Sequence, residues 1–155
     1  MKKPRYFLWI AAVETAGFLS GILSREGAAF YEANVRKPPL TPPGILFPIV
    51  WAVLYALMGI GAARVAASAD GQAGSRGLNI FVIQLVFNFF WSLIFFNVKS
   101  YGLSFLWLLV MWTLIIAMIL PFWKADKVAA LLQIPYLLWV TFAAYLNFGV
   151  WQLNR

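Results

Sequence analysis

Hydrophobic residues fill most of the chain, and its few charged residues separate five long apolar stretches. A helix needs about 20 mostly apolar residues to cross a bilayer, and each stretch is long enough for one crossing and too short for two. The pattern therefore predicts transmembrane helices over residues 6–24, 44–66, 78–97, 102–123 and 128–152. We expect an all-α polytopic membrane protein with a single domain over residues 1–155. Its architecture would be a bundle of five transmembrane helices with a long loop between helices 1 and 2.

That loop, residues 25–44, is the longest connector and shows no clear helix or strand period. Connectors of this length in a compact chain are usually functional or disordered. The aromatic residues and prolines of this connector argue against disorder. The other connectors are shorter and place consecutive helices antiparallel.

The end of the long connector reads KPPLTPPG at residues 37–44, here called the proline segment, and holds four of the chain's eight prolines. Proline fixes φ and disfavours helix at the residue before it, so the segment is expected to be stiff and extended. One interpretation is a helix start, in which Thr41 caps the second span and Pro42 and Pro43 lie in its first turn. The other is a lid held over the mouth of the bundle. The prolines assigned to this lid are Pro38, Pro39 and Pro43.

The composition excludes a soluble protein. Hydrophobic residues make up 63% of the chain and charged residues 11%, against roughly 45–50% and about 25% in soluble domains. The formal net charge is +7, but the basic residues stand singly or in pairs between apolar runs. Such residues are typical of anchors that contact anionic lipid, and we expect no nucleic-acid partner. We expect an integral, multi-pass protein of a bacterial inner or outer membrane, with the lipid bilayer as its partner.

Few side chains are available for catalysis. Histidine and cysteine are absent, so we expect no metal site, no disulfide and no thiolate chemistry. Glu14 is the only carboxylate inside a predicted span. Polar residues at that depth rarely face lipid, so Glu14 is interpreted either as a hydrogen-bonding partner within the bundle or as a proton or cation site.

Polar and aromatic residues share one face of the third span. Gln84, Asn88, Trp91 and Phe95 follow helical spacing and therefore lie on one stripe. Two interpretations stay open: a wall that hydrogen-bonds and stacks a flat ligand, or an amide clasp between helices.

The second and fifth spans show similar faces. Trp51 and Tyr55 are four residues apart in the second span, and Trp139 and Ala143 are four apart in the fifth, with Phe142 alongside. Packing and ligand contact are both compatible with these positions.

Small residues and one proline also have predicted roles. Gly17 and Gly21, and Gly59 and Ala63, have the small-xxx-small spacing that lets helices approach, either within the bundle or between two copies. Pro135 is expected to break the helix of the fifth span.

Four segments together carry a family resemblance: FYEANVRKPPLTPPG, FPIVWAVLYALMGIGAARV, QLVFNFFWSLIFF and PYLLWVTFAAYLN. They resemble the TspO/MBR family of tryptophan-rich sensory proteins, which includes the translocator protein, or peripheral-type benzodiazepine receptor. The segments cover most of the chain in family order. The chain departs from the family pattern at Leu40, where tryptophan is common.

The resemblance implies a five-helix bundle, often a homodimer, with a ligand pocket open toward the long connector. Family members bind tetrapyrroles such as protoporphyrin IX and haem, and drug-like aromatic ligands. The pocket residues implied by motif are Tyr31, Trp51, Asn88, Trp91, Ser92, Trp139, Phe142 and Ala143, with Pro42 and Pro43 holding the closing loop. The helix faces add Tyr55 and Gln84 to the ligand-binding candidates.

The function expected first is a membrane receptor or sensor for porphyrin-type ligands, which requires no cofactor. The propionates of a bound porphyrin would reach Arg36, Lys37 or loop N–H groups. An alternative is an enzyme that degrades protoporphyrin with light and oxygen, for which Trp51 and Trp139 are the only catalytic candidates. A transporter of tetrapyrroles is a further alternative, with the least support because the spans contain one carboxylate and no repeat.

Overall fold

The computed structural model describes residues 2–155, and these residues form helices and no strands. The elements in chain order are α1 (Tyr6–Leu23), α2 (Arg25–Asn34), α3 (Leu46–Ala66), α4 (Gly71–Ser92), the π-helix η1 (Leu93–Val98), α5 (Tyr101–Ala125), α6 (Lys127–Leu131) and α7 (Ile134–Leu153). Five segments are long and apolar enough to cross a membrane: Tyr6–Leu23, Leu46–Ala66, Gly71–Val98, Tyr101–Ala125 and Lys127–Leu153. The predicted fold class, with five spans, is confirmed.

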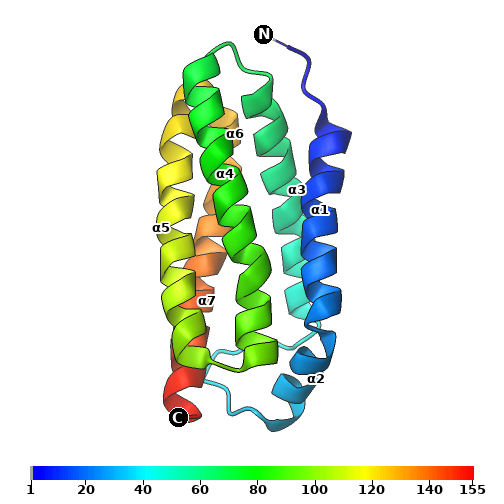
Figure 1. Cartoon of the computed structure of the whole chain (residues 1–155), viewed down its shortest axis with the longest axis vertical. Helices are drawn as coiled ribbons and strands as arrows, with labels where there is room; N and C mark the ends of the chain where they lie inside the picture. The colour runs from blue at the N-terminus through cyan, green and yellow to red at the C-terminus, as the bar shows by residue number, and fades with distance from the viewer. Residues whose placement is uncertain (1) are drawn as a thin grey trace.

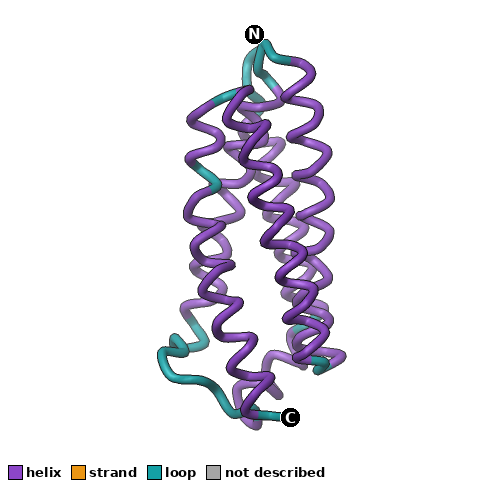
Figure 2. The backbone as a smooth tube through the Cα atoms, turned by 90° about the vertical axis from the view of Figure 1, so that its left-hand side faces the viewer, coloured by secondary structure: helices purple, strands orange, loops and turns teal. Residues whose placement is uncertain are grey.

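Consecutive spans run antiparallel, and the two ends of the chain lie at opposite ends of the bundle (Figure 1). The helix α2 and the connector that follows it lie at the end where the C-terminus is found. The view turned by 90° shows this connector as an extended excursion beside the helices (Figure 2). Any site near the connector therefore belongs to the C-terminal end of the bundle.

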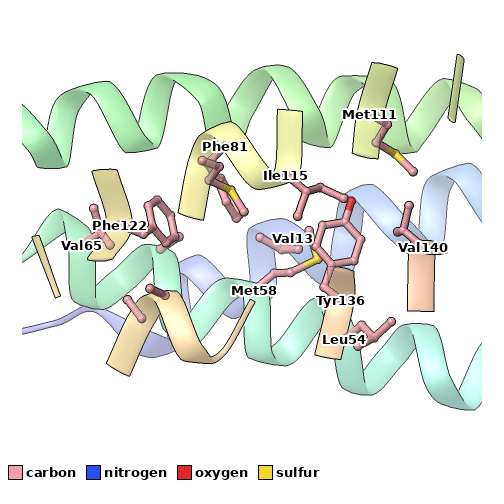
Figure 3. Close-up of a cluster of buried hydrophobic side chains, with 14 of the residues drawn as sticks. Val13, Leu54, Met58, Val65, Phe81, Met111, Ile115, Phe122, Tyr136 and Val140 are labelled. Atoms are coloured by element: carbon pink, nitrogen blue, oxygen red, sulfur yellow. The ribbon is translucent and has the colours of Figure 1, made fainter. Parts of the chain in front are cut away.

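The hydrophobic core lies between the helices and extends from Val65 and Phe122 near the N-terminal end of the bundle to Leu108 and Val140. Its fully buried side chains include Met58 of α3, Phe81 of α4, Ile115 of α5 and Tyr136 of α7, which converge between the helices (Figure 3). Transfer of one side chain of this size from water to an apolar interior is favourable by about 1.5–3 kcal/mol. In a bilayer that term is weaker, so close packing carries more of the stability.

Glycine permits the closest helix contact. A Cβ added at Gly59 of α3 would lie 2.7 Å from Cα of Ile10 in α1, and one added at Gly17 would enter the ring of Tyr55. Nothing lies within 4 Å of a Cβ built at Gly21. Of the two roles predicted for these small residues, packing within the bundle therefore applies to Gly17 and Gly59.

The connector after α1 corrects one expectation. Residues 25–34 were expected to be irregular, but they form α2, whose sequence REGAAFYEAN is rich in alanine and glutamate. Glu26 lies in the first turn, where its negative charge interacts favourably with the positive end of the helix dipole. Gly27 lies against the backbone of Phe96 in η1, where an added Cβ would fall 2.6 Å from the carbonyl carbon.

The predicted start of the second span is also wrong in detail. The helix α3 begins at Leu46 and has no side-chain cap, so Pro42 and Pro43 precede it rather than occupying its first turn. The hydroxyl of Thr41 donates instead to the carbonyl of Pro38 at 2.6 Å. Pro48 is the proline that lies in the first turn of α3, where its missing N–H costs no helical hydrogen bond.

The predicted break in the fifth span is confirmed. The helix α6 ends at Leu131, and α7 starts at Ile134 with Pro135 in its first turn. The side chain of Gln133 at this break donates to the carbonyl of Ala129 at 3.2 Å. Some of the backbone acceptors freed by the interruption are thus satisfied locally.

Candidate functional site

The C-terminal half of the bundle encloses a cavity of about 670 Å³. Its walls come from α1, α2, α3, α4, η1 and α7, with Met111 of α5 behind them. The aromatic residues on the walls are Phe18, Tyr31, Phe47, Trp51, Tyr55, Trp91, Phe95, Phe96 and Trp139. The C-terminal half of the bundle therefore contains a space lined largely by aromatic side chains.

Eight of the eleven predicted ligand-binding residues line this cavity. They are Tyr31, Trp51, Tyr55, Asn88, Trp91, Ser92, Trp139 and Ala143. Three do not: Pro42, Gln84 and Phe142. Gln84 lies one helical turn deeper than Asn88 and hydrogen-bonds to Tyr136, while the ring of Phe142 packs against Trp139 and Tyr145.

A chain of hydrogen bonds closes the floor of the cavity. The hydroxyl of Tyr55 donates to Oδ1 of Asn88 at 2.8 Å. Nδ2 of Asn88 donates to the hydroxyl of Tyr136 at 2.9 Å, which in turn donates to Oε1 of Gln84 at 2.6 Å. The interhelical clasp is therefore present at Gln84 and Asn88. Asn88 also lines the cavity, and contact of this stripe with a flat ligand stays a prediction.

Trp91 is held in one orientation. Its indole N–H donates to Oδ1 of Asn147 at 3.1 Å, and Nδ2 of Asn147 donates to the carbonyl of Tyr101 at 2.9 Å. The ring of Phe95 stacks on the indole, with ring centroids 5.0 Å apart and an interplanar angle of 23°. A fixed ring loses little conformational freedom when a ligand stacks against it.

Two further indoles line the cavity. Trp51 of α3 stacks on Tyr55, with centroids 5.3 Å apart, and Trp139 of α7 meets the edge of Phe47 of α3 at 5.8 Å. The helices α3 and α7 thus each contribute a tryptophan to the same space.

Tyr31 of α2 lies at the connector end of the cavity, against Phe95 and Phe96 of η1. Burial raises the pKa of Tyr31 to about 12, and the charges of Glu32 and Tyr101 act in the same direction. Its phenol is therefore a neutral hydrogen-bond donor at physiological pH.

The charged residues on the cavity wall differ from those expected. Glu14, Arg25 and Glu32 line it, whereas Arg36 and Lys37 do not. The ammonium group of Lys37 donates instead to three carbonyls of the connector, at 3.1–3.2 Å, and pairs with Glu32 at 3.7 Å. Within residues 2–155, no three His, Cys, Asp or Glu side chains form a group that could hold a metal ion.

The proline segment is attached to α7, and Gly44 is the one residue of the segment on the cavity wall among those that the structure describes. The hydroxyl of Tyr145 donates to the carbonyl of Pro39 at 2.8 Å, and Pro38 packs on Gly149. Just before the segment, the backbone N–H of Arg36 donates to Oδ1 of Asn154 at 3.0 Å, and Nδ2 of Asn154 donates back to its carbonyl at 2.8 Å.

The cavity wall includes Gly44, which ends the proline segment, and Phe47 and Pro48, which follow it. The segment itself also contains Leu40, whose φ of 70° is rare for a residue other than glycine. The structure thus places Pro38 and Pro39 against α7, and none of Pro38, Pro39, Pro42 and Pro43 lines the cavity.

Sequence reasoning missed several lining residues. Phe47 lies four residues before Trp51, and Asn147 lies four residues after Ala143, so the helical spacing already contained a signal for both. Ser20 of α1 and Ser24, which follows that helix, gave no such signal because their face shows no aromatic stripe.

A family model described as the TspO/MBR family matches residues 9–152. The chain belongs to the TspO/MBR family. This TspO/MBR protein is 36% identical over 155 residues to protein CrtK of Rhodobacter capsulatus, covering 99% of this chain and 95% of that protein. It is 36% identical over 148 residues to tryptophan-rich protein TspO of Chlorobaculum tepidum, covering 95% and 94%. It is 32% identical over 156 residues to the translocator protein of Ovis aries, covering 95% and 92%.

The family assignment confirms the resemblance carried by the four sequence segments. It also agrees with the five candidate spans, so the chain is an integral, multi-pass membrane protein of a family of tryptophan-rich proteins and translocator proteins.

Proposed function

We propose that this protein is a membrane receptor that binds flat, apolar ring systems of the porphyrin class, and drug-like aromatic molecules of similar shape, inside the bundle. The observation that carries the proposal is the cavity of about 670 Å³ with three indoles on its walls. Ligand sites in proteins are typically clefts of about 300–1,000 Å³ lined by apolar and aromatic side chains with few polar groups. The cavity has this size and chemistry.

The aromatic walls suit a flat macrocycle. Offset-stacked or edge-to-face ring contacts add about 0.5–1.5 kcal/mol each beyond the apolar area that they bury. Trp51 and Trp139 come from different helices, so a ring system between them would contact both.

The polar groups would set the orientation of the ligand. Arg25 is the only cation on the wall within residues 2–155, and its fork of N–H donors suits a propionate. The carboxylates of Glu14 and Glu32 also reach the wall, so the propionate edge is expected at Arg25 and away from both.

Free-base porphyrin is expected to bind at least as well as haem. Strong axial ligands to haem iron are histidine and cysteine, and the chain has neither. Tyr31, Tyr55 and Met111 are the remaining wall residues of a type that can ligate iron.

Quenching of tryptophan fluorescence during titration with protoporphyrin IX tests the proposal in detergent or nanodiscs. Ala143→Phe fills the cavity and is expected to weaken binding more than tenfold. Leu138→Phe adds a ring to the same helix at an exposed position outside the cavity wall, so it is the matched control. Equal affinity of the two variants would place the ligand elsewhere and overturn the proposal.

A second candidate function is breakdown of the bound porphyrin by light and oxygen. The observation that favours it is the presence of Trp51 and Trp139 on the same wall, where an excited porphyrin and oxygen would meet oxidisable indoles. Bleaching under light in air should slow in Trp51→Phe and Trp139→Phe relative to Trp123→Phe, which lies outside the cavity wall. Equal bleaching rates in all three variants would contradict the breakdown function and leave ligand binding as the only proposed function.

A further inference from the structure

A second cavity, of about 530 Å³, lies at the opposite end of the bundle between α4 and α5. None of its lining residues belongs to the aromatic cavity. At this point the two helices touch, because a Cβ added at Gly77 of α4 would lie 2.7 Å from Cδ1 of Phe122 in α5. This cavity, here called the α4–α5 groove, is therefore held by a close helix contact.

The groove changes from polar to apolar with depth. Arg76 of α4 and Lys124 of α5 lie toward the helix ends, whereas Ile80 and Ala117 lie further into the spans. At 1.5 Å per residue, Ala117 is about 10 Å deeper than Lys124. This order matches an amphiphile that has a charged head and an apolar tail.

Both cations are free to bind an anion. Within residues 2–155, neither Arg76 nor Lys124 takes part in an ion pair or a side-chain hydrogen bond. The one carboxylate on the groove, Asp70, accepts a 3.0 Å hydrogen bond from the backbone N–H of Ala73 as the cap of α4. The groove therefore has a net positive charge.

The position of the cations matches the level of lipid headgroups. Trp123, which precedes Lys124, is 47% exposed. The ammonium group of Lys127 lies 5.6 Å from the centroid of its ring. Exposed tryptophan beside lysine at the end of a membrane span is typical of the interface between lipid and water.

We propose that the α4–α5 groove is a binding site for an anionic phospholipid. Arg76 and Lys124 would contact the phosphate, and an acyl chain would run along Ile80, Ala117 and Leu120. Basic pockets between transmembrane helices recognise lipid headgroups by this chemistry. The site is independent of the aromatic cavity and of what that cavity binds.

Native mass spectrometry of the detergent-solubilised full chain, titrated with phosphatidylglycerol or phosphatidylcholine, tests this proposal. Phosphatidylglycerol is expected to bind more tightly than phosphatidylcholine. The double variant Arg76→Ala with Lys124→Ala should weaken phosphatidylglycerol binding about tenfold or more. The control double variant Lys3→Ala with Arg5→Ala removes one lysine and one arginine at the same end of the bundle but outside the groove. It should change the affinity for phosphatidylglycerol less than twofold. Equal loss in the two double variants would show a diffuse charge effect and overturn the proposal.

A steric variant tests the acyl part of the site. Ala117→Phe leaves every charge in place but fills the deeper groove, and it should also weaken phosphatidylglycerol binding, whereas millimolar inorganic phosphate should not displace the lipid. Ile80→Phe, placed on the other wall, serves as a second variant if Ala117→Phe melts early by circular dichroism. Unchanged lipid binding in a folded steric variant, or displacement by phosphate, would contradict a phospholipid site.

Discussion

The hydroxyl of Tyr136 on α7 donates a 2.6 Å hydrogen bond to Oε1 of Gln84 on α4, and both side chains are fully buried. The same hydroxyl accepts from Asn88, which also accepts from Tyr55 of the cavity wall. The polar chain thus joins α3, α4 and α7 at the floor of the aromatic cavity. Buried polar groups of this kind are costly when a partner is lost.

Tyr136→Phe should destabilise the protein by about 1–2 kcal/mol, because one substitution removes the buried partner of Nδ2 of Asn88 and of Oε1 of Gln84. Unfolding in a mixed-micelle titration measures this. Tyr145→Phe is the matched control, since it removes an exposed hydroxyl, and its cost should be below about 1 kcal/mol. An equal cost for both variants would contradict the account of the clasp.

Gly59→Ala should destabilise the contact between α1 and α3 by about 1–3 kcal/mol, since the new methyl group would meet the backbone of Ile10. Gly21→Ala introduces the same methyl group into open space and should be neutral or slightly stabilising. Thermal unfolding compares the two. The account of the glycine contacts fails if Gly21→Ala is the more damaging change.

The ion pair of Arg64 and Asp126, at 3.0 Å, should make stability depend on pH. Burial acts to raise the pKa of Asp126, but hydrogen bonds from the Ala129 N–H and from Arg64 outweigh it and hold that pKa below its usual value. Protons then bind more readily to the unfolded chain, so this stabilisation is complete at neutral pH and is lost as pH falls through about 4 and below.

Asp126→Asn should remove that dependence, at a cost of less than about 1 kcal/mol at neutral pH because the pair is partly exposed. Melting temperatures between about pH 6 and 3 should fall more steeply for the unmodified chain than for the variant. Asp70→Asn is the control, because Asp70 also caps a helix but forms no ion pair within residues 2–155. Parallel curves of melting temperature against pH for the unmodified chain and Asp126→Asn would show that the ion pair is not the source of the pH dependence.

Freeing the proline segment from α7 should speed ligand exchange. Asn154→Ala removes both hydrogen bonds to Arg36, and Tyr145→Phe removes the one to Pro39. Stopped-flow fluorescence with protoporphyrin IX should show association and dissociation rates that both rise several-fold, with a smaller change in Kd. Thr113→Val, which changes an exposed hydroxyl on α5 far from the segment, should leave both rates unchanged.

The spans could be predicted because bilayer thickness sets the length of each apolar stretch, and charges mark where each one ends. The start of α3 could not, because Thr41 has a local partner in the carbonyl of Pro38 that competes with helix capping. The helix α2 was missed because its contact with η1, through Gly27, is between segments far apart in the sequence.

The candidate site was predictable where one helix face carries its signal, as with Trp51 and Trp139. Gln84 shows the limit of this reasoning, because helical spacing gives the face on which a residue lies but not its depth in the bundle. The hydrogen-bond partner of Gln84 is Tyr136 on another helix, which the spacing within one helix does not reveal. The charged wall residues Arg25 and Glu32 were missed for a related reason. They reach the cavity only because α2 folds back over the end of the bundle.

The most direct measurement is a structure of the complex with protoporphyrin IX in lipid nanodiscs. The account predicts density for the macrocycle between Trp51 of α3 and Trp139 of α7, with a propionate at Arg25. Density outside the bundle, on the lipid-facing surface or in the α4–α5 groove, with the aromatic cavity unoccupied, would contradict it.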